Sequence, residues 1–261
     1  MAAMIRLELL KLRRTSLLWV GVAAWMLAIL VSFYLAAADR MTQYTVAIFM
    51  GNIVSNNQSS LFPFVAVLTV GRMMECERTS HTLRGILTIP VKFSALLAAK
   101  LEAGVLLTLG YSLLQWVLGV GCCFGLHLPG LEAGALLRDL LVLAASNLCV
   151  YIAVLPVIAL SAQFAGGYVA GTVFAVFYGF CSIFVEGGVF SALYPICAGT
   201  VLLGPGRYRP TLPQCLCALL SLGCMLGLGI LFTATARDRT GEHRPKPGSS
   251  PLQRKAGRQR Q

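Results

Sequence analysis

Long runs of apolar residues separated by short polar segments make up most of this chain. The runs are close to the roughly 20 residues that an α-helix needs to cross a bilayer. Strict apolar–polar alternation over about ten residues, the pattern of a barrel strand, is absent. We therefore predict an all-α, polytopic membrane protein with six transmembrane helices, of which the second begins in a polar stretch: Leu17–Ala38, 54–74, 103–124, 140–162, 168–185 and 215–236.

The composition supports a membrane protein. Hydrophobic residues make up 57% of the chain and charged residues only 12%, and the mean hydropathy is +0.77. A chain with so few polar groups cannot cover a water-exposed surface, so lipid is the expected surrounding of most of it.

Basic residues are concentrated in three segments. Residues 1–16 hold four Lys and Arg, residues 72–100 hold five and residues 237–261 hold eight, out of 21 in the chain. Six spans place these three segments on one side of the membrane, and Lys and Arg accumulate on the cytoplasmic side. We therefore predict that both termini are cytoplasmic. The net charge of +11 is explained by this topology, so no nucleic-acid partner is predicted.

Three regions follow from this pattern. Residues 17–236 form the six-helix transmembrane domain. Residues 1–16 carry Ile5, Leu9 and Leu12 at helical spacing among basic residues, which suits an amphipathic helix in the membrane interface. A solvated positive flank of the first span is the alternative. Residues 237–261 are basic and rich in proline and serine, and we predict a disordered cytoplasmic tail.

No catalytic or metal site is indicated. The chain has no Gly-Lys dipeptide, so it lacks the phosphate-binding loop of nucleotide hydrolases, and it has no His-Glu-x-x-His pattern. Its nine cysteines lack zinc-site spacing, and most lie in or beside predicted spans, where a cysteine behaves as a small apolar residue. We predict that the chain is not an enzyme and holds no cofactor or metal of its own.

One acidic residue, Glu186, lies near the outer end of the fifth predicted span. Acidic residues within spans are costly and often mark a substrate path. Glu186 follows an apolar run and precedes Gly187 and Gly188, so it either lines such a path or sits at the outer interface.

The segment between the second and third spans has the pattern of a short interfacial helix. Thr79 or Ser80 can cap it, an apolar stripe follows at helical spacing, and Pro90 ends it. Glu75 and Glu77 would favour the positive N-terminal end of that helix and leave Arg78 available to a partner's carboxylates. An ordinary amphipathic loop is the alternative.

The same segment carries a resemblance to a known family. Glu77, the Thr82-Leu83 pair, the Ile89-Pro90-Val91 step and Lys100 resemble the region after the second span of type-2 ABC exporter permeases. The opening run from Ile5 to Arg14 also resembles the amphipathic N-terminal helix of that family. The chain is most similar to the permease subunits of bacterial lantibiotic-immunity and bacitracin-resistance exporters.

The resemblance implies a transport subunit in a bacterial cytoplasmic membrane. A separate ABC ATPase subunit would bind ATP and Mg²⁺ and push on a short cytoplasmic coupling helix, and a second permease subunit would complete the path. The cargo would be amphipathic or hydrophobic, such as an antimicrobial peptide, and would leave the membrane or the cell. The residues implied in coupling are Glu75, Glu77, Arg78, Thr82, Leu83, Gly85, Ile89 and Pro90.

Two other classes of membrane protein remain as alternatives. An ion-coupled secondary carrier would need intramembrane carboxylates or a repeated broken-helix pattern in both halves, and neither is evident in the sequence. A non-transporting scaffold or sensor is compatible with six spans that lack catalytic signatures.

Overall fold

The computed structural model describes residues 17–38, 44–79, 92–204 and 210–237, and every regular element within them is a helix. The prediction of an all-α membrane protein is therefore confirmed. The amphipathic segment 1–16, the coupling helix expected around residues 80–90 and residues 238–261 of the tail lie outside the described residues. The helices are α2 (Leu17–Ala38), α3 (Val46–Asn56), the π-helix η1 (Asn57–Leu61), α4 (Phe62–Thr79), α6 (Phe93–Gly125), α7 (Ala133–Ser161), α8 (Gly167–Val185), the 3-10 helix η2 (Val189–Ala192), α9 (Ala198–Leu203) and α10 (Leu212–Ala234).

The predicted count of six spans holds when α3 and α4 are taken as one broken span. Five helices in the described residues, α2, α6, α7, α8 and α10, are long and apolar enough to cross a membrane, and the bent pair is the sixth. The second span, predicted over 54–74, instead runs from Val46 to Thr79 with a bend of 51°. The polar stretch predicted to be its entrance is the site of the bend.

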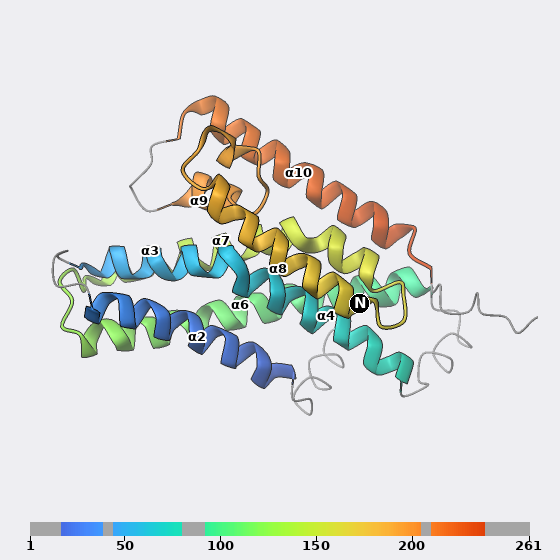
Figure 1. Ribbon diagram of the computed structural model, residues 1–261, viewed down its shortest axis with the longest axis horizontal. Coiled ribbons are helices and arrows are strands. Elements are labelled where there is room, and N and C mark those ends of the chain that lie inside the picture. Colours follow the sequence, from blue (N-terminus) through green and yellow to red (C-terminus); the bar gives the residue numbers. More distant parts are fainter. Residues whose placement is uncertain (1–16, 39–43, 80–91, 205–209, 238–261) are drawn as a thin grey trace, which may run out of the picture.

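The spans run alternately between two ends of the bundle (Figure 1). We call one the Thr79 end, because α4 finishes there and α6 starts there. We call the other the Glu186 end, after the C-cap residue of α8. α7 is the central helix, since it packs against α3, α4, α6, α8, α9 and α10. It continues through Pro156 without ending.

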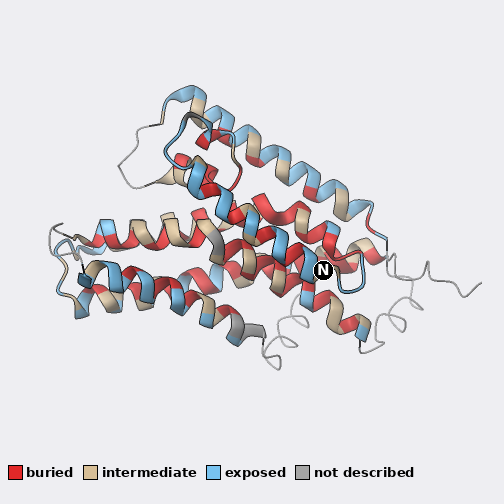
Figure 2. Ribbon diagram, viewed as in Figure 1, coloured by how far each residue is buried: buried red, intermediate tan, exposed pale blue. Residues whose placement is uncertain are grey.

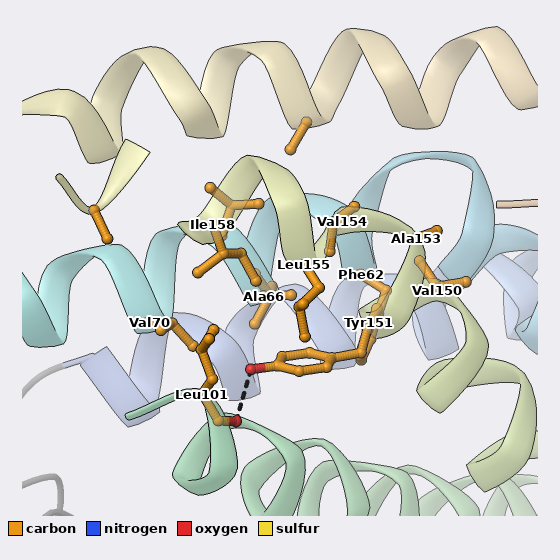
Figure 3. Close-up of a cluster of buried hydrophobic side chains, with 14 of the residues drawn as sticks. Phe62, Ala66, Val70, Leu101, Val150, Tyr151, Ala153, Val154, Leu155 and Ile158 are labelled. Carbon is orange, nitrogen blue, oxygen red and sulfur yellow. Dashed lines mark hydrogen bonds between the residues drawn. The ribbon is translucent and has the colours of Figure 1, made fainter. Parts of the chain in front are cut away.

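The core lies where α4, α6 and α7 meet (Figure 3). Tyr151 of α7 is 1% exposed, and its hydroxyl donates a hydrogen bond of 2.9 Å to the carbonyl oxygen of Leu101 in α6. Gly104 makes room for it, because a Cβ at that position would overlap the Tyr151 hydroxyl oxygen. Around this bond pack apolar side chains from the three helices, among them Phe62, Ala66, Val70, Val150, Val154 and Ile158.

Large apolar side chains cover the outside of the bundle. Figure 2 shows exposed residues along the outer faces of α2, α8 and α10. Phe184 of α8 is 89% exposed and Leu212 of α10 is 81% exposed. A surface of this kind is unfavourable in water but matches lipid tails, so these faces are the expected lipid-facing sides.

The connection between α8 and α10 turns back into the bundle. The Tyr194 hydroxyl donates a 2.6 Å hydrogen bond to the carbonyl oxygen of Tyr178, which lies about two turns before the end of α8. Farther along, Gly199 in α9 packs beside Cys149 of α7. Cys149 is about 24 Å along α7 from Ala133 at the usual helical rise, so the connection is a re-entrant segment.

Gly229 allows α10 to approach α7 closely. A Cβ at position 229 would stand 2.9 Å from Cγ of Leu155 and still nearer one of its methyl groups. We expect Gly229→Ala to lower the stability of the bundle by about 1–3 kcal/mol through overpacking. The measurement is the midpoint of detergent-induced unfolding. Gly227→Ala is the matched control, because nothing lies within 4 Å of its Cβ position, and an equal loss in both variants would contradict the close approach.

Candidate functional site

A buried ion pair joins two helices at the Thr79 end. Lys100 Nζ of α6 donates a 2.9 Å hydrogen bond to Glu77 Oε1 of α4. Lys100 is 1% exposed and Glu77 is 5% exposed. A buried charge is tolerated only when it is paired, so each residue stabilises the other in place. The pair ties the last turns of α4 to α6.

A second polar contact ties the same turns of α4 to the α7–α8 connection. Arg78 Nη1 and Nη2 each donate a 2.6 Å hydrogen bond, to the carbonyl oxygens of Phe164 and Ala162. Glu75 Oε2 accepts a 3.1 Å hydrogen bond from the backbone N–H of Gly166 and lies 3.6 Å from Arg78 Nη1. The planar guanidinium of Arg78 thereby satisfies the carbonyl oxygens of Ala162 and Phe164, which follow the last turn of α7.

These contacts form what we call the α4 clamp: Glu75, Glu77, Arg78 and Lys100 together with the turn 162–166. Three of the predicted coupling residues, Glu75, Glu77 and Arg78, belong to it. Thr82, Leu83, Gly85, Ile89 and Pro90 lie outside the described residues. The role of the set in coupling remains a prediction.

Two details of the clamp differ from what the sequence indicated. Arg78 was expected to face a partner's carboxylates, whereas both terminal nitrogens of its guanidinium bind carbonyls of the same chain. The third span was predicted over 103–124, which left Lys100 outside it. α6 instead begins at Phe93, and Lys100 is buried within it, where Glu77 compensates its charge.

Buried amide side chains gather where the second span bends. Asn57 Nδ2 donates hydrogen bonds to Gln115 Oε1 at 2.8 Å and to Asn147 Oδ1 at 3.2 Å, and Gln115 Nε2 donates back to Asn57 Oδ1 at 3.0 Å. All three residues are at most 1% exposed. We call Asn57, Gln115 and Asn147 the amide cluster. It joins η1, α6 and α7.

Hydroxyl groups extend the cluster on one side. Asn147 Nδ2 donates to Ser112 Oγ at 2.8 Å, and Ser112 Oγ donates to the carbonyl oxygen of Thr108 at 2.8 Å. A separate bond of 3.0 Å runs from Asn56 Nδ2 to Ser32 Oγ of α2. Single π-turns are frequent at functional sites, and this one brings four helices together through polar contacts.

Glu186 contacts the broken span. Ser55 Oγ lies 3.1 Å and 3.2 Å from the two carboxylate oxygens of Glu186 and donates to them. The bond joins the end of α8 to α3 at the Glu186 end. Both sequence interpretations of Glu186, a path residue or an interface residue, are compatible with this position.

Metal chemistry has no site in the described part of the chain. Over residues 17–38, 44–79, 92–204 and 210–237 no group of three or more His, Cys, Asp or Glu side chains is placed to hold an ion. All nine cysteines lie in this part and are free thiols.

A comparison with protein families gives a match over residues 4–182 to the ABC-2 family transporter proteins. No curated protein matches the chain in sequence. The match spans five of the six segments described above, including both the α4 clamp and the amide cluster. The chain therefore belongs to the ABC-2 transporter family, as a multi-pass permease component.

Proposed function

We propose that this permease belongs to an ATP-driven exporter of the bacterial cytoplasmic membrane, with a separate ABC ATPase subunit and a second permease subunit. The ATPase subunit binds ATP and Mg²⁺, and this chain moves an amphipathic or hydrophobic cargo, such as an antimicrobial peptide, out of the membrane or the cell. The observation that supports the proposal best is the α4 clamp, because it connects the end of α4 to two other parts of the bundle.

The clamp gives a physical route for coupling. Residues 80–91 follow directly after α4, and the resemblance to type-2 ABC exporter permeases implies that the ATPase would contact this segment. A force on that segment reaches Glu77 and Arg78 within the last turns of α4. The buried ion pair passes it to α6 through Lys100, and the guanidinium of Arg78 passes it to the turn between α7 and α8. Two spans and the α7–α8 connection then move together.

The bend in the second span suits the alternating-access step of transport. Alternating access requires that a helix change direction or tilt, and breaks in spanning helices are common near transport sites. Here the break is held by side-chain amides rather than by backbone contacts alone. Rearranging a few hydrogen bonds of the amide cluster would change the angle between α3 and α4 without unfolding either helix.

The expected orientation follows from charge. The Thr79 end would face the cytoplasm, with both termini on the same side, because residues 1–16, 72–100 and 237–261 carry most of the basic residues. Only that orientation allows a cytoplasmic ATPase to reach residues 80–91.

The proposal is tested by isolating the chain from bacterial membranes in lipid nanodiscs and measuring ATP hydrolysis of what co-purifies. We expect an ABC ATPase to be present. Arg78→Lys should lower its ATP hydrolysis roughly tenfold while the ATPase still co-purifies, because lysine cannot bind both carbonyls and a charge-assisted hydrogen bond is worth about 1.5–3 kcal/mol.

Arg138→Lys provides the matched control, since Arg138 is an exposed residue of α7 near the Glu186 end. It should leave ATP hydrolysis unchanged. Absence of any ATPase would contradict the exporter, and ion-coupled uptake in its place would support a secondary carrier. Unchanged hydrolysis in Arg78→Lys would show that the clamp does not carry the coupling.

A further inference from the structure

Two polar groups beside the amide cluster have no hydrogen-bond partner in the described part of the chain. One is Nε2 of Gln58, a residue that is 2% exposed, and the other is Oγ of Ser146, a residue that is 1% exposed. Burying an unsatisfied donor or hydroxyl costs about 1–3 kcal/mol. Such groups are rare in folded proteins and usually have a function or a partner that is absent from the structure.

The Gln58 amide nitrogen and the backbone of Ser146 lie against one residue of the re-entrant segment. A Cβ built on Gly199 of α9 would stand 3.3 Å from Gln58 Nε2, 3.3 Å from Ser146 Cα and 3.3 Å from Cys149 Cβ. The backbone of α9 therefore lies directly against the Gln58 amide and against α7 at Ser146, and a side chain at position 199 would crowd both. α9 excludes other molecules from the two groups but gives them no hydrogen bond.

The side chains that α9 buries are small. α9 is six residues long and packs through small or medium apolar side chains. Ala198 and Val201 contact α7 and α10 in a cluster with Ala218 and Leu222. Burial of such side chains contributes less than burial of large ones. Withdrawal of α9 would expose three small or medium residues, Ala198, Gly199 and Val201, and would free polar groups that are unfavourable where they are.

We propose that Gln58 and Ser146 form a cargo-binding site for uncharged hydrogen-bonding groups, such as peptide amides, which α9 covers in this conformation and uncovers during transport. This inference rests on the proposed function, since it assigns a site within the transport path. The site adjoins the bend of the second span, so a change in that bend and withdrawal of α9 act on the same place.

The chemistry of the site determines the class of ligand. Gln58 offers an amide with donors and an acceptor, and Ser146 offers a hydroxyl. The groups next to them, Cys149 and the amide cluster, are neutral. An anionic group would lose its hydration here without gaining an opposite charge, which is unfavourable by several kcal/mol. A neutral amide or hydroxyl would instead satisfy the two unpartnered atoms.

A disulfide between α9 and α7 tests whether the cover moves. Gly199→Cys places a thiol beside the native Cys149, and the spacing of 3.3 Å between the two Cβ positions is close to the 3.5–4.5 Å of disulfides. The locked protein carries Gly199→Cys, Cys149 and Gln58→Cys with the other cysteines replaced, and it is oxidised with copper phenanthroline. The unlocked protein carries Gln58→Cys as its sole cysteine.

The readout is labelling of the thiol introduced at position 58, in intact cells, by a membrane-impermeant methanethiosulfonate reagent. We expect labelling in the unlocked protein and at least tenfold slower labelling in the locked one. Glu132→Cys in place of Gln58→Cys is the control for both proteins, because Glu132 is the exposed, charged N-cap residue of α7 at the Glu186 end and should be labelled equally. Equal labelling at position 58 in both proteins, or no labelling in either, would contradict the proposal that α9 withdraws from position 58.

The class of ligand is tested in a third protein that keeps Gln58 and Ser146 and carries the native Cys149, which lies beside Gly199, as its sole cysteine. Acetyl-tetraleucine amide, an uncharged peptide, should slow labelling of Cys149 severalfold, whereas tetradecane, which has no hydrogen-bonding groups, should not. Equal effects of the two probes overturn the assignment to hydrogen-bonding groups. Co-purification of an ATPase together with equal labelling of the locked and unlocked proteins would contradict the proposed site but not the proposed exporter. Absence of an ATPase would contradict the proposed function itself.

Discussion

Replacing Lys100 with methionine is expected to destabilise the bundle by about 3–5 kcal/mol, because it leaves the Glu77 carboxylate buried without a compensating charge. Glu77 is only 5% exposed and Lys100 is 1% exposed, so water cannot replace the lost partner without moving helices apart. The measurement is the midpoint of detergent-induced unfolding in mixed micelles, followed by helical signal.

The double variant Glu77→Gln with Lys100→Met separates charge from packing. Removing both charges together is often close to neutral, so the double variant should recover most of the lost stability. Glu102→Gln serves as the control, since Glu102 is an exposed carboxylate on the same helix. A loss in Lys100→Met no greater than in Glu102→Gln would contradict the buried pair.

The same series separates stability from coupling. If the ion pair carries force from α4 to α6, the double variant should remain deficient in ATP hydrolysis although its stability has recovered. A neutral pair of side chains resists sliding of the two helices less than a charge-assisted hydrogen bond of 2.9 Å does. Recovery of both properties would restrict the pair to a structural role.

The spans themselves could be predicted from sequence because the requirement that produces them is local. A helix in lipid must satisfy its own backbone and present apolar side chains, so length and hydropathy identify α2, α8 and α10 to within a few residues. The beginning of α6 at Phe93 could not be placed in this way. In the sequence alone, the charge of Lys100 indicates the end of a span. Only the structure shows that Glu77 of α4 pairs with it and allows Lys100 to lie inside α6.

The polar contacts were harder to predict because each joins residues far apart in the chain. The sequence pattern places Asn56, Asn57 and Gln58 at the polar entrance of a span, whereas Asn57 pairs with Gln115 of α6 and Asn147 of α7. Neither Gln115 nor Asn147 belongs to a recognisable motif. A lone amide in each of two apolar runs, Gln115 and Asn147, is the signal that indicates such a cluster, since an unpaired amide is unfavourable in lipid.

The re-entrant α9 gave no signal of its own in the sequence. It is six residues long and follows a broken, glycine-containing stretch, so neither length nor periodicity distinguishes it from a loop. Only the fit of Gly199 against Cys149 places it inside the bundle.

Asn57→Leu is expected to lower the stability of the bundle by about 2–5 kcal/mol, because it breaks three hydrogen bonds and leaves the buried Gln115 side chain without its partner. Asn56→Leu is the matched control. The neighbouring Asn56 is only partly buried and loses a single 3.0 Å bond to Ser32, so about 1 kcal/mol is expected there. Both variants are compared by detergent-induced unfolding in the same lipid.

The triple variant Asn57→Leu, Gln115→Leu and Asn147→Leu decides what the amide cluster is for. Removing all partners leaves no orphaned amide, and Ser112 keeps its bond to the Thr108 carbonyl, so stability should return close to that of the native chain. If the cluster serves only to hold three helices together, transport-linked ATP hydrolysis should return as well. We expect it to stay low, because apolar packing has no alternative set of hydrogen bonds through which the bend between α3 and α4 can change. Full recovery of hydrolysis in the triple variant would show that the bend is fixed during transport.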